Sequence, residues 1–235
     1  MTRLTADAFI ARLEREASEA ERLKYRRYFP ERHHEFIGVR MGAVFAASRD
    51  FASMDLDQIE RLLESDVHEV RAGAVRIMAE QAKARAATDE QIQALAALYL
   101  RRHDRIDDWD LVDLGAWDVL GRSLIDSPRD VLDELAGSDD PWRRRSAITA
   151  TFAFIRRDEL DDTYRIAGRL LDDAHELVRK AVGWALRNAG DHDPERLNEF
   201  LDAHAATMPR STLRNAIEKL APEERKRLLA LGRTG

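Results

Sequence analysis

The sequence predicts an all-α fold built from many short helices. Apolar residues recur with the period of a helix along almost the whole chain, and no stretch alternates as a strand does. Prolines fall mainly at helix starts or in turns, at Pro128, Pro141, Pro194, Pro209 and Pro222. The 235 residues are enough to bury a substantial core. Because no linker or low-complexity stretch interrupts them, we predict a single domain over residues 1–235.

The predicted elements follow one another closely. A charged amphipathic helix covers residues 5–27 and either continues or breaks before Pro30, and a second covers Val39–Ser48; together they form an N-terminal helical cap over about residues 1–50. Repeats are expected over about residues 51–220, before a short C-terminal helix. The helices after the cap are predicted at 55–64, 67–83, 89–102, 108–122, 128–137, 140–156, 159–171, 174–189, 194–206, 208–220 and 222–231.

A short motif containing an arginine recurs along these helices. It reads VRAGAV at Arg71, RRRSAI at Arg144, VRKAVG at Arg179 and LRNAIE at Arg214, with spacings of 73, 35 and 35 residues. A helical pair every 35 to 40 residues is typical of a HEAT-like α–α solenoid, in which paired antiparallel helices form a curved stack with a concave cleft. We expect the recurring arginine to bond the turn between helices rather than to contact a ligand.

Composition restricts the compartment. The chain has no cysteine, which excludes disulfides and thiolate metal sites and fits a reducing cytoplasm. No apolar stretch approaches the length of a membrane span, and the N-terminal residues, with Glu14, Glu16, Glu19 and Glu21, lack the apolar region of a signal peptide. We therefore expect a cytoplasmic monomer that does not associate with membranes.

The stretch Asp107–Leu120, DDWDLVDLGAWDVL, contains the main candidate site. Asp107 or Asp108 is suited to cap its helix. Trp109 and Asp113 are four residues apart and therefore share one helix face. An indole and a carboxylate side by side suit the recognition of a cation, because both attract positive charge. The structural alternative is a half-buried tryptophan beside a solvated aspartate.

The repeat spacing extends this pair into a row. Steps of 36, 35 and 35 residues from the pair reach positions that are mostly polar, charged or aromatic: Arg145, Lys180 and Asn215 from Trp109, and Thr149, Trp184 and Lys219 from Asp113. A position buried in every repeat would be apolar throughout, as Ala74, Ala147 and Val182 are. Since equivalent positions of a solenoid line one surface, we expect the row to line the concave cleft. Arg187 lies one turn beyond Trp184 on the same face.

At these residues the chain resembles the HEAT-like DNA alkylation-repair glycosylases of the AlkD type, over about residues 20–220. The resemblance is carried by four motifs in order: FIGVR at Phe36–Arg40, WDLVD at Trp109–Asp113, PWRRRSAI at Pro141–Ile148 and RKAVGWALR at Arg179–Arg187. It implies that Asp113 is the catalytic carboxylate. It further implies that Trp109 and Trp184 pack around the damaged nucleotide and that Arg145 holds the DNA backbone. The chain departs from the family at Gly42, where proline is common, and in being acidic.

The activity implied is that of a DNA glycosylase releasing N3- or N7-alkylated purines from duplex DNA. Such a base carries a positive charge and leaves readily. As its glycosidic bond breaks, positive charge builds up on the deoxyribose. A carboxylate such as Asp113 stabilises that charge or orients a water. Two alternatives remain: a catalytically silent HEAT scaffold that binds DNA or a protein partner, and a glycosylase devoted to a bulky genotoxin adduct.

The net charge of −6 by itself argues against binding of nucleic acid, but such binding depends on where the charges lie on the surface. We expect an electropositive concave face whose DNA-binding cations are Arg145, Lys180, Arg187, Arg214 and Lys219. No cofactor or metal is predicted, since no His-Glu pair extends to a HExxH zinc motif. Trp117 and Trp142 are assigned to packing between repeats, and His103 to a surface loop.

Overall fold

The computed structural model describes residues 4–29 and 35–231. Within these ranges the regular structure is helical, and the β pairing consists of one isolated parallel bridge between Glu35 and Val67. The predicted all-α class is confirmed. None of the described helices is both long enough and apolar enough to cross a membrane. The chain divides into two compact units, Met1–Ser123 and Leu124–Gly235. The single domain and the concave curvature, which involve both units, stay predictions.

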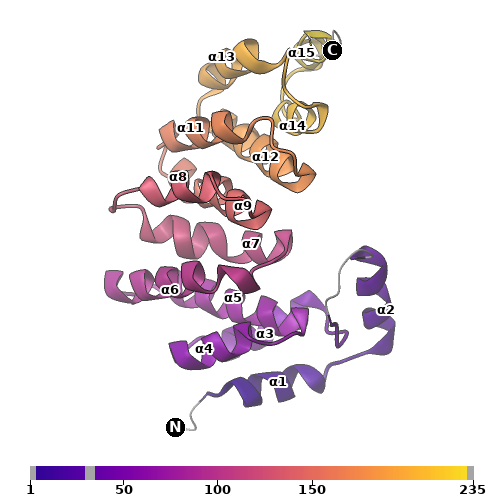
Figure 1. The fold of residues 1–235 in the computed structure, drawn as a ribbon, viewed down its shortest axis with the longest axis vertical. Helices are drawn as coiled ribbons and strands as arrows, with labels where there is room; N and C mark the ends of the chain where they lie inside the picture. The colour runs from indigo at the N-terminus through magenta and orange to yellow at the C-terminus, as the bar shows by residue number, and fades with distance from the viewer. Residues whose placement is uncertain (1–3, 30–34, 232–235) are drawn as a thin grey trace. The chain divides into compact units, whose positions relative to one another are not determined.

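The first unit is built around α5. Its elements are α1 (Ala6–Glu14), α2 (Glu19–Tyr28), α3 (Met41–Asp50), α4 (Leu56–Leu63), α5 (His68–Lys83), α6 (Asp89–Arg101), a 3-10 turn (His103–Arg105), α7 (Trp109–Gly115) and a π-helical segment (Ala116–Gly121). Helix α5 packs against α3, α4, α6 and α7 (Figure 1). Most of its side chains are buried. It therefore supplies the core on which the other helices of this unit are arranged.

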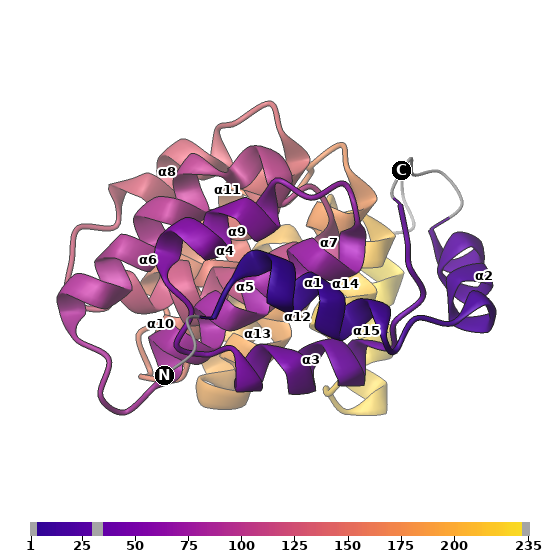
Figure 2. The same cartoon turned by 90° about the horizontal axis from the view of Figure 1, so that it is seen from below.

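The predicted charged helix over residues 5–27 is wrong in one respect, because it is two helices. Helix α1 ends at Glu14, and α2 begins at Glu19 and stands away from α1 at the edge of the unit (Figures 1 and 2). Between them the Ser18 N–H donates to the Gly38 carbonyl at 2.9 Å. Gly38 has a φ of +85°, and a Cβ there would lie 2.1 Å from the Ser18 carbonyl oxygen. This close approach requires glycine and takes Ser18 out of the helix.

The second unit continues the pattern of consecutive packed helices. Its elements are α8 (Asp130–Ala136), α9 (Pro141–Ala150), α10 (Phe152–Ile155), α11 (Asp161–Leu170), α12 (Glu176–His192), α13 (Pro194–His204), α14 (Arg210–Ala216) and α15 (Pro222–Leu231). Helices α8 and α9 pack together, as do α11 and α12, and α12 also packs against α14. The predicted helix over 140–156 is interrupted at Thr151, whose hydroxyl donates to the Ile148 carbonyl at 2.7 Å and competes with the helical pattern.

The recurring arginine bonds the turn before its own helix, as the repeat predicts. In three copies one guanidinium nitrogen donates to the carbonyls six and five residues earlier: Arg71 to Ser65 and Asp66, Arg144 to Ser138 and Asp139, and Arg179 to Asp173 and Ala174. Arg71 also reaches Asp107 in the turn before α7, and Arg144 reaches Asp173 in the turn before α12, which are the corresponding turns of the next repeat. The fourth copy, Arg214, is exposed and makes no such bond within the described ranges.

The pair formed by Arg144 and Asp173 is suited to a stability test, because the two side chains are only 16% and 4% exposed. Burial acts to raise the pKa of Asp173, but hydrogen bonds from Arg144 and from the His175 N–H outweigh it and hold that pKa below its ordinary value. We expect Arg144→Gln to lower the free energy of unfolding by about 3 kcal/mol, because a buried carboxylate loses its cation. Chemical denaturation at pH 7 measures this.

The matched control is Arg143→Gln, which changes the exposed neighbour and should alter stability by less than about 0.5 kcal/mol. Because the pKa of Asp173 is depressed in the folded state, the stabilisation is present above the unfolded pKa of about 3.9. It is lost as the pH falls through the lower, folded pKa, so the difference between wild type and Arg144→Gln should shrink there. Equal losses of unfolding free energy in Arg144→Gln and Arg143→Gln would contradict a stabilising pair between Arg144 and Asp173.

Candidate functional site

The N-terminal turn of α7 is fixed by three carboxylates, each with a structural contact. Asp108 is the N-cap and accepts the Trp109 N–H at 2.5 Å, so of the two predicted caps it is the one used. Asp110 accepts the Leu111 N–H at 2.9 Å. Asp107 pairs with Arg71 at 3.1 Å. The position where α7 begins is therefore determined by contacts on both sides of the helix start.

Trp109 and Asp113 lie one turn apart on α7, and both are partly exposed. Leu111 and Gly115, on the opposite side of the helix, are buried towards α5. A Cβ at Gly115 would lie 2.6 Å from a methyl carbon of Val75, so α7 approaches its neighbours closely there. The candidate pair thus occupies the face of α7 that points away from the core of this unit.

An aromatic hollow of about 300 Å³ lies beside Trp109. It is lined by side chains from α2, α3 and α7: Lys24, Tyr25, Tyr28, Phe29, Met41, Trp109 and Asp110. The rings of Tyr28 and Trp109 have centroids 6.4 Å apart, and Tyr28 is 68% exposed. The hollow therefore offers ring faces for stacking, with one carboxylate and one ammonium group among its lining residues.

His68 joins the elements that form this hollow. Its Nε2 lies 2.7 Å from Asp110 Oδ2, and its ring centroid is 5.4 Å from those of Phe29 and Phe36. Its backbone N–H donates to the Glu35 carbonyl at 2.9 Å. Ligand atoms of His68, Asp108 and Asp110 also lie within 4.8 Å of one another, so this group could hold a metal ion. The hydrogen bond to His68 and the cap at Asp108 already give these residues a structural role.

The segment Phe36–Arg40 holds α2 in place. The buried Glu69 carboxylate accepts the N–H groups of Gly38 at 2.7 Å and Val39 at 3.2 Å. Tyr25 stacks on Phe36 with a centroid distance of 5.2 Å and donates its hydroxyl to the Val39 carbonyl at 2.9 Å. The segment thus positions the aromatic residues of α2, including those that line the hollow.

Two of the predicted residues of the second unit, Arg145 and Thr149, are more buried than Trp109 and Asp113. Trp184 is partly exposed and packs against Phe152 with a centroid distance of 4.3 Å. Arg145 is only 5% exposed, and one guanidinium nitrogen donates to the Leu177 carbonyl. Thr149 is fully buried. Polar character in this row therefore does not by itself mark an exposed surface. The convergence of Arg145 and Trp184 with the pair on α7 stays a prediction.

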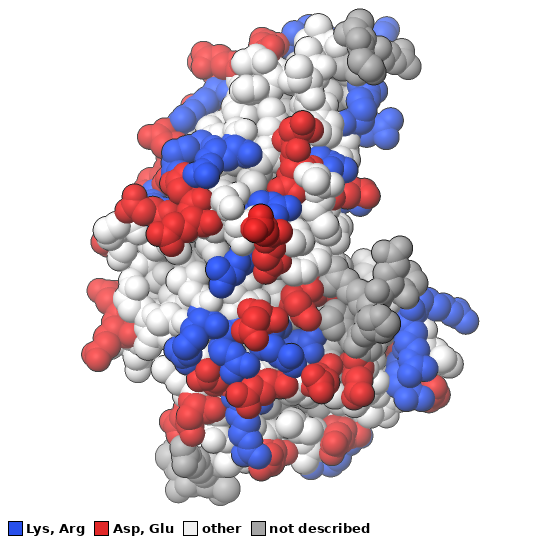
Figure 3. All heavy atoms as spheres, viewed as in Figure 1, with Lys and Arg blue, Asp and Glu red and all other residues white. Residues whose placement is uncertain are grey.

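The other four predicted DNA-binding cations are available to different degrees. Lys180 pairs with Glu176 at 2.8 Å, Arg187 with Glu218, and Lys219 with Asp191. Arg214 is exposed and has no ion-pair partner among the residues that the structure describes. On the face shown in Figure 3, Lys and Arg side chains are interspersed with Asp and Glu. Local ion pairing thus offsets much of the positive charge that the sequence offers.

Sequence reasoning missed the residues that support the site. His68 and Asp110 are 42 positions apart, so no local pattern reveals their contact. The aromatic spacing of Tyr25, Tyr28 and Phe29 on one helix was the available signal for the hollow. The placement of His103 in a surface loop is wrong: it is 1% exposed and packs edge-on against Tyr99.

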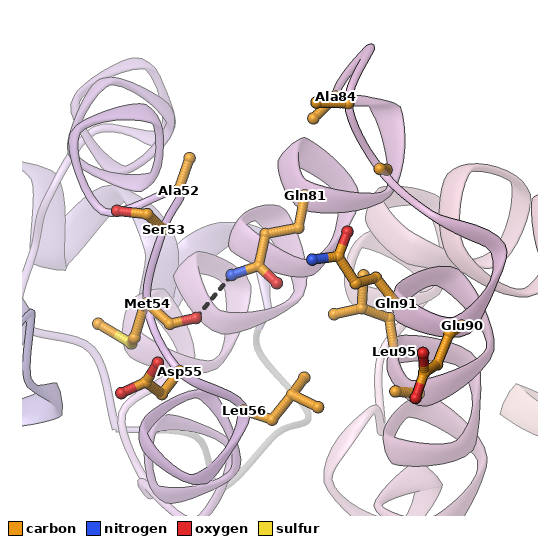
Figure 4. A pocket seen from close by; sticks show the side chains of 13 residues that line it. Ala52, Ser53, Met54, Asp55, Leu56, Gln81, Ala84, Glu90, Gln91 and Leu95 are labelled. Carbon is orange, nitrogen blue, oxygen red and sulfur yellow. Dashed lines mark hydrogen bonds between the residues drawn. The ribbon is translucent and has the colours of Figure 1, made fainter.

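Another hollow, of about 570 Å³, lies at the far end of α5 (Figure 4). Gln81 reaches across it and donates to the Met54 carbonyl at 2.7 Å. Gln91 and Glu90 from α6 lie on its other side. It is lined by none of the predicted site residues, and α5 separates it from His68 by about 20 Å at 1.5 Å per residue. It is therefore distinct from the site at α7.

The fold and the site together define a helical-repeat protein with an aromatic and acidic site on one helix face. The chain belongs to the DNA alkylation repair enzyme family, whose model matches residues 9–220. It resembles a structure described as a predicted DNA alkylation repair enzyme from Enterococcus faecalis, with a TM-score of 0.70 and 16% identity over 88% of this chain and 98% of that one. It also resembles AlkD2 from Streptococcus mutans, with a TM-score of 0.55 and 19% identity over 97% of each chain. No curated protein sequence matches.

Tyr25 provides a test of how the hollow is held. Burial, followed by the nearby charges of Glu69 and Glu21, raises the pKa of Tyr25 to about 12. Tyr25→Phe keeps the ring but removes the hydroxyl that Val39 accepts, so we expect a loss of about 1 kcal/mol in the free energy of unfolding. The control Tyr28→Phe removes an exposed hydroxyl and should change stability by less than about 0.5 kcal/mol.

The same hydroxyl gives a pH dependence with a definite sign. Its pKa is raised on folding, so the stabilisation is fully present below the unfolded pKa of about 10. It is lost as the pH rises through about 12. The stability of wild type relative to Tyr25→Phe should therefore fall over this interval in denaturation curves. A wild-type advantage that is unchanged between pH 9 and pH 12 would contradict the buried hydroxyl.

Proposed function

We propose that the protein is a DNA glycosylase that releases positively charged N3- or N7-alkylated purines from duplex DNA. The observation that carries the proposal is the pair of Trp109 and Asp113 on the outward face of α7, beside an aromatic hollow. In a member of the DNA alkylation repair enzyme family, an indole and a carboxylate in this arrangement suit a cationic base and a cationic sugar.

The chemistry needs little from the protein beyond this pair. Cleavage breaks the bond between C1′ and the purine nitrogen, and the bonding electrons leave with the base and neutralise its positive charge. The deoxyribose becomes an oxocarbenium ion, which a carboxylate stabilises electrostatically. A water molecule then adds at C1′ and gives up a proton, for which Asp113 is the proposed acceptor. No strong general acid, cofactor or metal takes part in the proposed reaction.

The aromatic side chains supply orientation. The ring face of Trp109 attracts the positive charge of the damaged nucleotide, and Tyr28 offers a second, exposed ring nearby. We propose that Trp184 contributes a further ring from the second unit. The hollow of about 300 Å³ favours a second candidate function, release of a bulky adduct, because it offers more room than a methyl group needs. A release assay with N7-methylguanine, N3-methyladenine and a bulky adduct distinguishes the two.

The proposed contacts to the DNA backbone come from the five cations of the second unit. Lys180, Arg187 and Lys219 have carboxylate partners and would exchange them for phosphates. Such a change is inexpensive, because exposed ion pairs contribute only about 0–1 kcal/mol. Arg214 has no partner to leave among the described residues. We propose Arg145 as the fifth backbone contact, and its guanidinium group also donates to the Leu177 carbonyl.

Asp113→Asn separates catalysis from binding. The change keeps the size of the side chain but removes the charge that stabilises the oxocarbenium ion. We expect base release to fall by roughly 10²–10⁴-fold, the range for a positioned acid–base group. DNA affinity should hold or improve, because an anion near phosphates is removed. Release is measured under single-turnover conditions, so that slow product release does not mask the chemical step.

Asp104→Asn is the matched control, because it removes a carboxylate that is exposed and lies outside the site. It should release base at the wild-type rate. An Asp113→Asn variant that also excises cationic purines at the wild-type rate would defeat the glycosylase proposal. Wild-type protein that binds duplex DNA but releases no alkylated base would support the silent scaffold.

Arg145→Ala tests the proposed backbone contact. If Arg145 contacts phosphate, losing a hydrogen bond between charged groups should weaken duplex binding by about tenfold or more. Because the variant also loses the bond to the Leu177 carbonyl, the melting temperature is measured beside the affinity, and binding is compared where both proteins are folded. Arg143→Ala, at the exposed neighbouring position, is the control. A lower melting temperature with unchanged affinity would assign Arg145 a purely structural role.

A further inference from the structure

The last two helices, α14 and α15, and the turn between them concentrate cations, and four of these cations are not among the five proposed above to bind DNA. Residues 210–231 contain six Lys and Arg against three Glu, in a chain whose net charge is −6. A hollow of about 450 Å³ lies between these helices. It is lined by three cations and three apolar residues: Arg210, Arg225, Lys226, Pro222, Leu229 and Ala230. The local charge here is opposite in sign to that of the whole protein.

The hollow has a defined geometry because α15 is held at several points. Leu228 is fully buried and anchors the helix. Arg227 pairs with Asp202 on α13 at 2.6 Å. Arg210 donates from one guanidinium nitrogen to the Leu229 carbonyl at 2.7 Å, which ties the start of α14 to the end of α15. Arg210 is thereby fixed at the edge of the hollow while it keeps four further donors.

The cations of the hollow differ from most others in the second unit. Elsewhere in this unit arginines are matched with carboxylates: Arg129, Arg144, Arg165, Arg169, Arg187 and Arg196. Arg225 and Lys226 are exposed, and no carboxylate of the described residues lies within ion-pair distance of them. On the same helix, Glu224 is already paired with Arg227. The positive charge of the hollow is thus not neutralised from within the described protein.

We propose that this hollow binds a phosphate group of the DNA backbone, as a contact additional to the five DNA-binding cations proposed above. The guanidinium groups of Arg210 and Arg225 present planar donors that match phosphate oxygens, and Lys226 adds a mobile point charge. Leu229 and Ala230 provide an apolar wall against which a deoxyribose packs. The choice of DNA as the source of the phosphate rests on the proposed function, whereas the charge and shape of the hollow do not.

The experiment measures binding of an undamaged duplex by the full chain as a function of salt concentration. The slope of log K against log salt is negative, and loss of one phosphate contact should reduce its magnitude by about 0.9. We expect Lys226→Gln and Arg225→Gln each to weaken binding at low salt by about tenfold and to reduce the slope. Arg227→Gln removes the same charge from the same helix outside the hollow, and it should leave the slope unchanged. Circular dichroism verifies that each variant keeps its helices.

A second arm uses inorganic phosphate, with ionic strength held constant by chloride. If phosphate binds to wild-type protein but not to Lys226→Gln, and the DNA slope is the same in both, the hollow takes a small phosphate compound and the DNA proposal is overturned. The DNA proposal is also overturned if Arg227→Gln reduces the magnitude of the slope as much as Lys226→Gln does. The change would then reflect the loss of any positive charge on α15 and not a contact in the hollow.

The two proposals fail in different ways. If wild-type protein releases alkylated bases but Arg225→Gln and Lys226→Gln leave the slope unchanged, the hollow is not a DNA contact and the glycosylase proposal stands. If the two variants reduce the slope but wild-type protein releases no base, the hollow is a DNA contact in a non-catalytic protein. If wild-type protein binds no duplex at low salt, both proposals fail.

Discussion

The structure depends on a recurring arginine that hydrogen-bonds the turn before its own helix at three places in the chain. A turn between two helices leaves backbone carbonyls without helical partners, and buried carbonyls must find donors. Arg71, Arg144 and Arg179 provide these donors, always to the carbonyls five and six residues earlier. Two of them also reach an aspartate in the corresponding turn of the next repeat, at Asp107 and Asp173. One side chain therefore fixes the shape of its own turn and its distance from the next.

This constraint reaches the candidate site directly. Asp107, the partner of Arg71, lies two residues before Trp109, so the contact between Arg71 and Asp107 helps to set where α7 begins. The Asp108 cap and the bond between His68 and Asp110 then fix the rotation of that first turn. Trp109 and Asp113 share a face because they are four residues apart, and these contacts at the start of α7 orient that face. The carboxylates of Asp107, Asp108 and Asp110 thus make structural contacts, and Asp113, which follows them on α7, is the one that we propose as catalytic.

Much of this arrangement could be predicted from the sequence, where the signal is periodic. Helical spacing located the elements, and the recurring Arg71 motif correctly predicted a turn contact. The motif at Trp109–Asp113 pointed to the family. The break at Ser18 could not be predicted, because it depends on Gly38, twenty residues later. The burial of Arg145 and Thr149 was missed for a related reason: a repeat step gives the face of a helix, but neighbouring side chains decide how much of that face is covered.

The acidic net charge is compatible with DNA binding because of how the charges are paired. Lys180 and Lys219 each lie against an exposed carboxylate, at Glu176 and Asp191. In water such pairs are weak, so a phosphate can replace the carboxylate at little cost. The displaced carboxylate still repels the duplex, which lowers affinity for DNA in general. Binding then depends on geometry that aligns several cations with successive phosphates at once. In the proposed function, the acidic chain gives up general attraction to DNA and relies on the few contacts that are correctly placed.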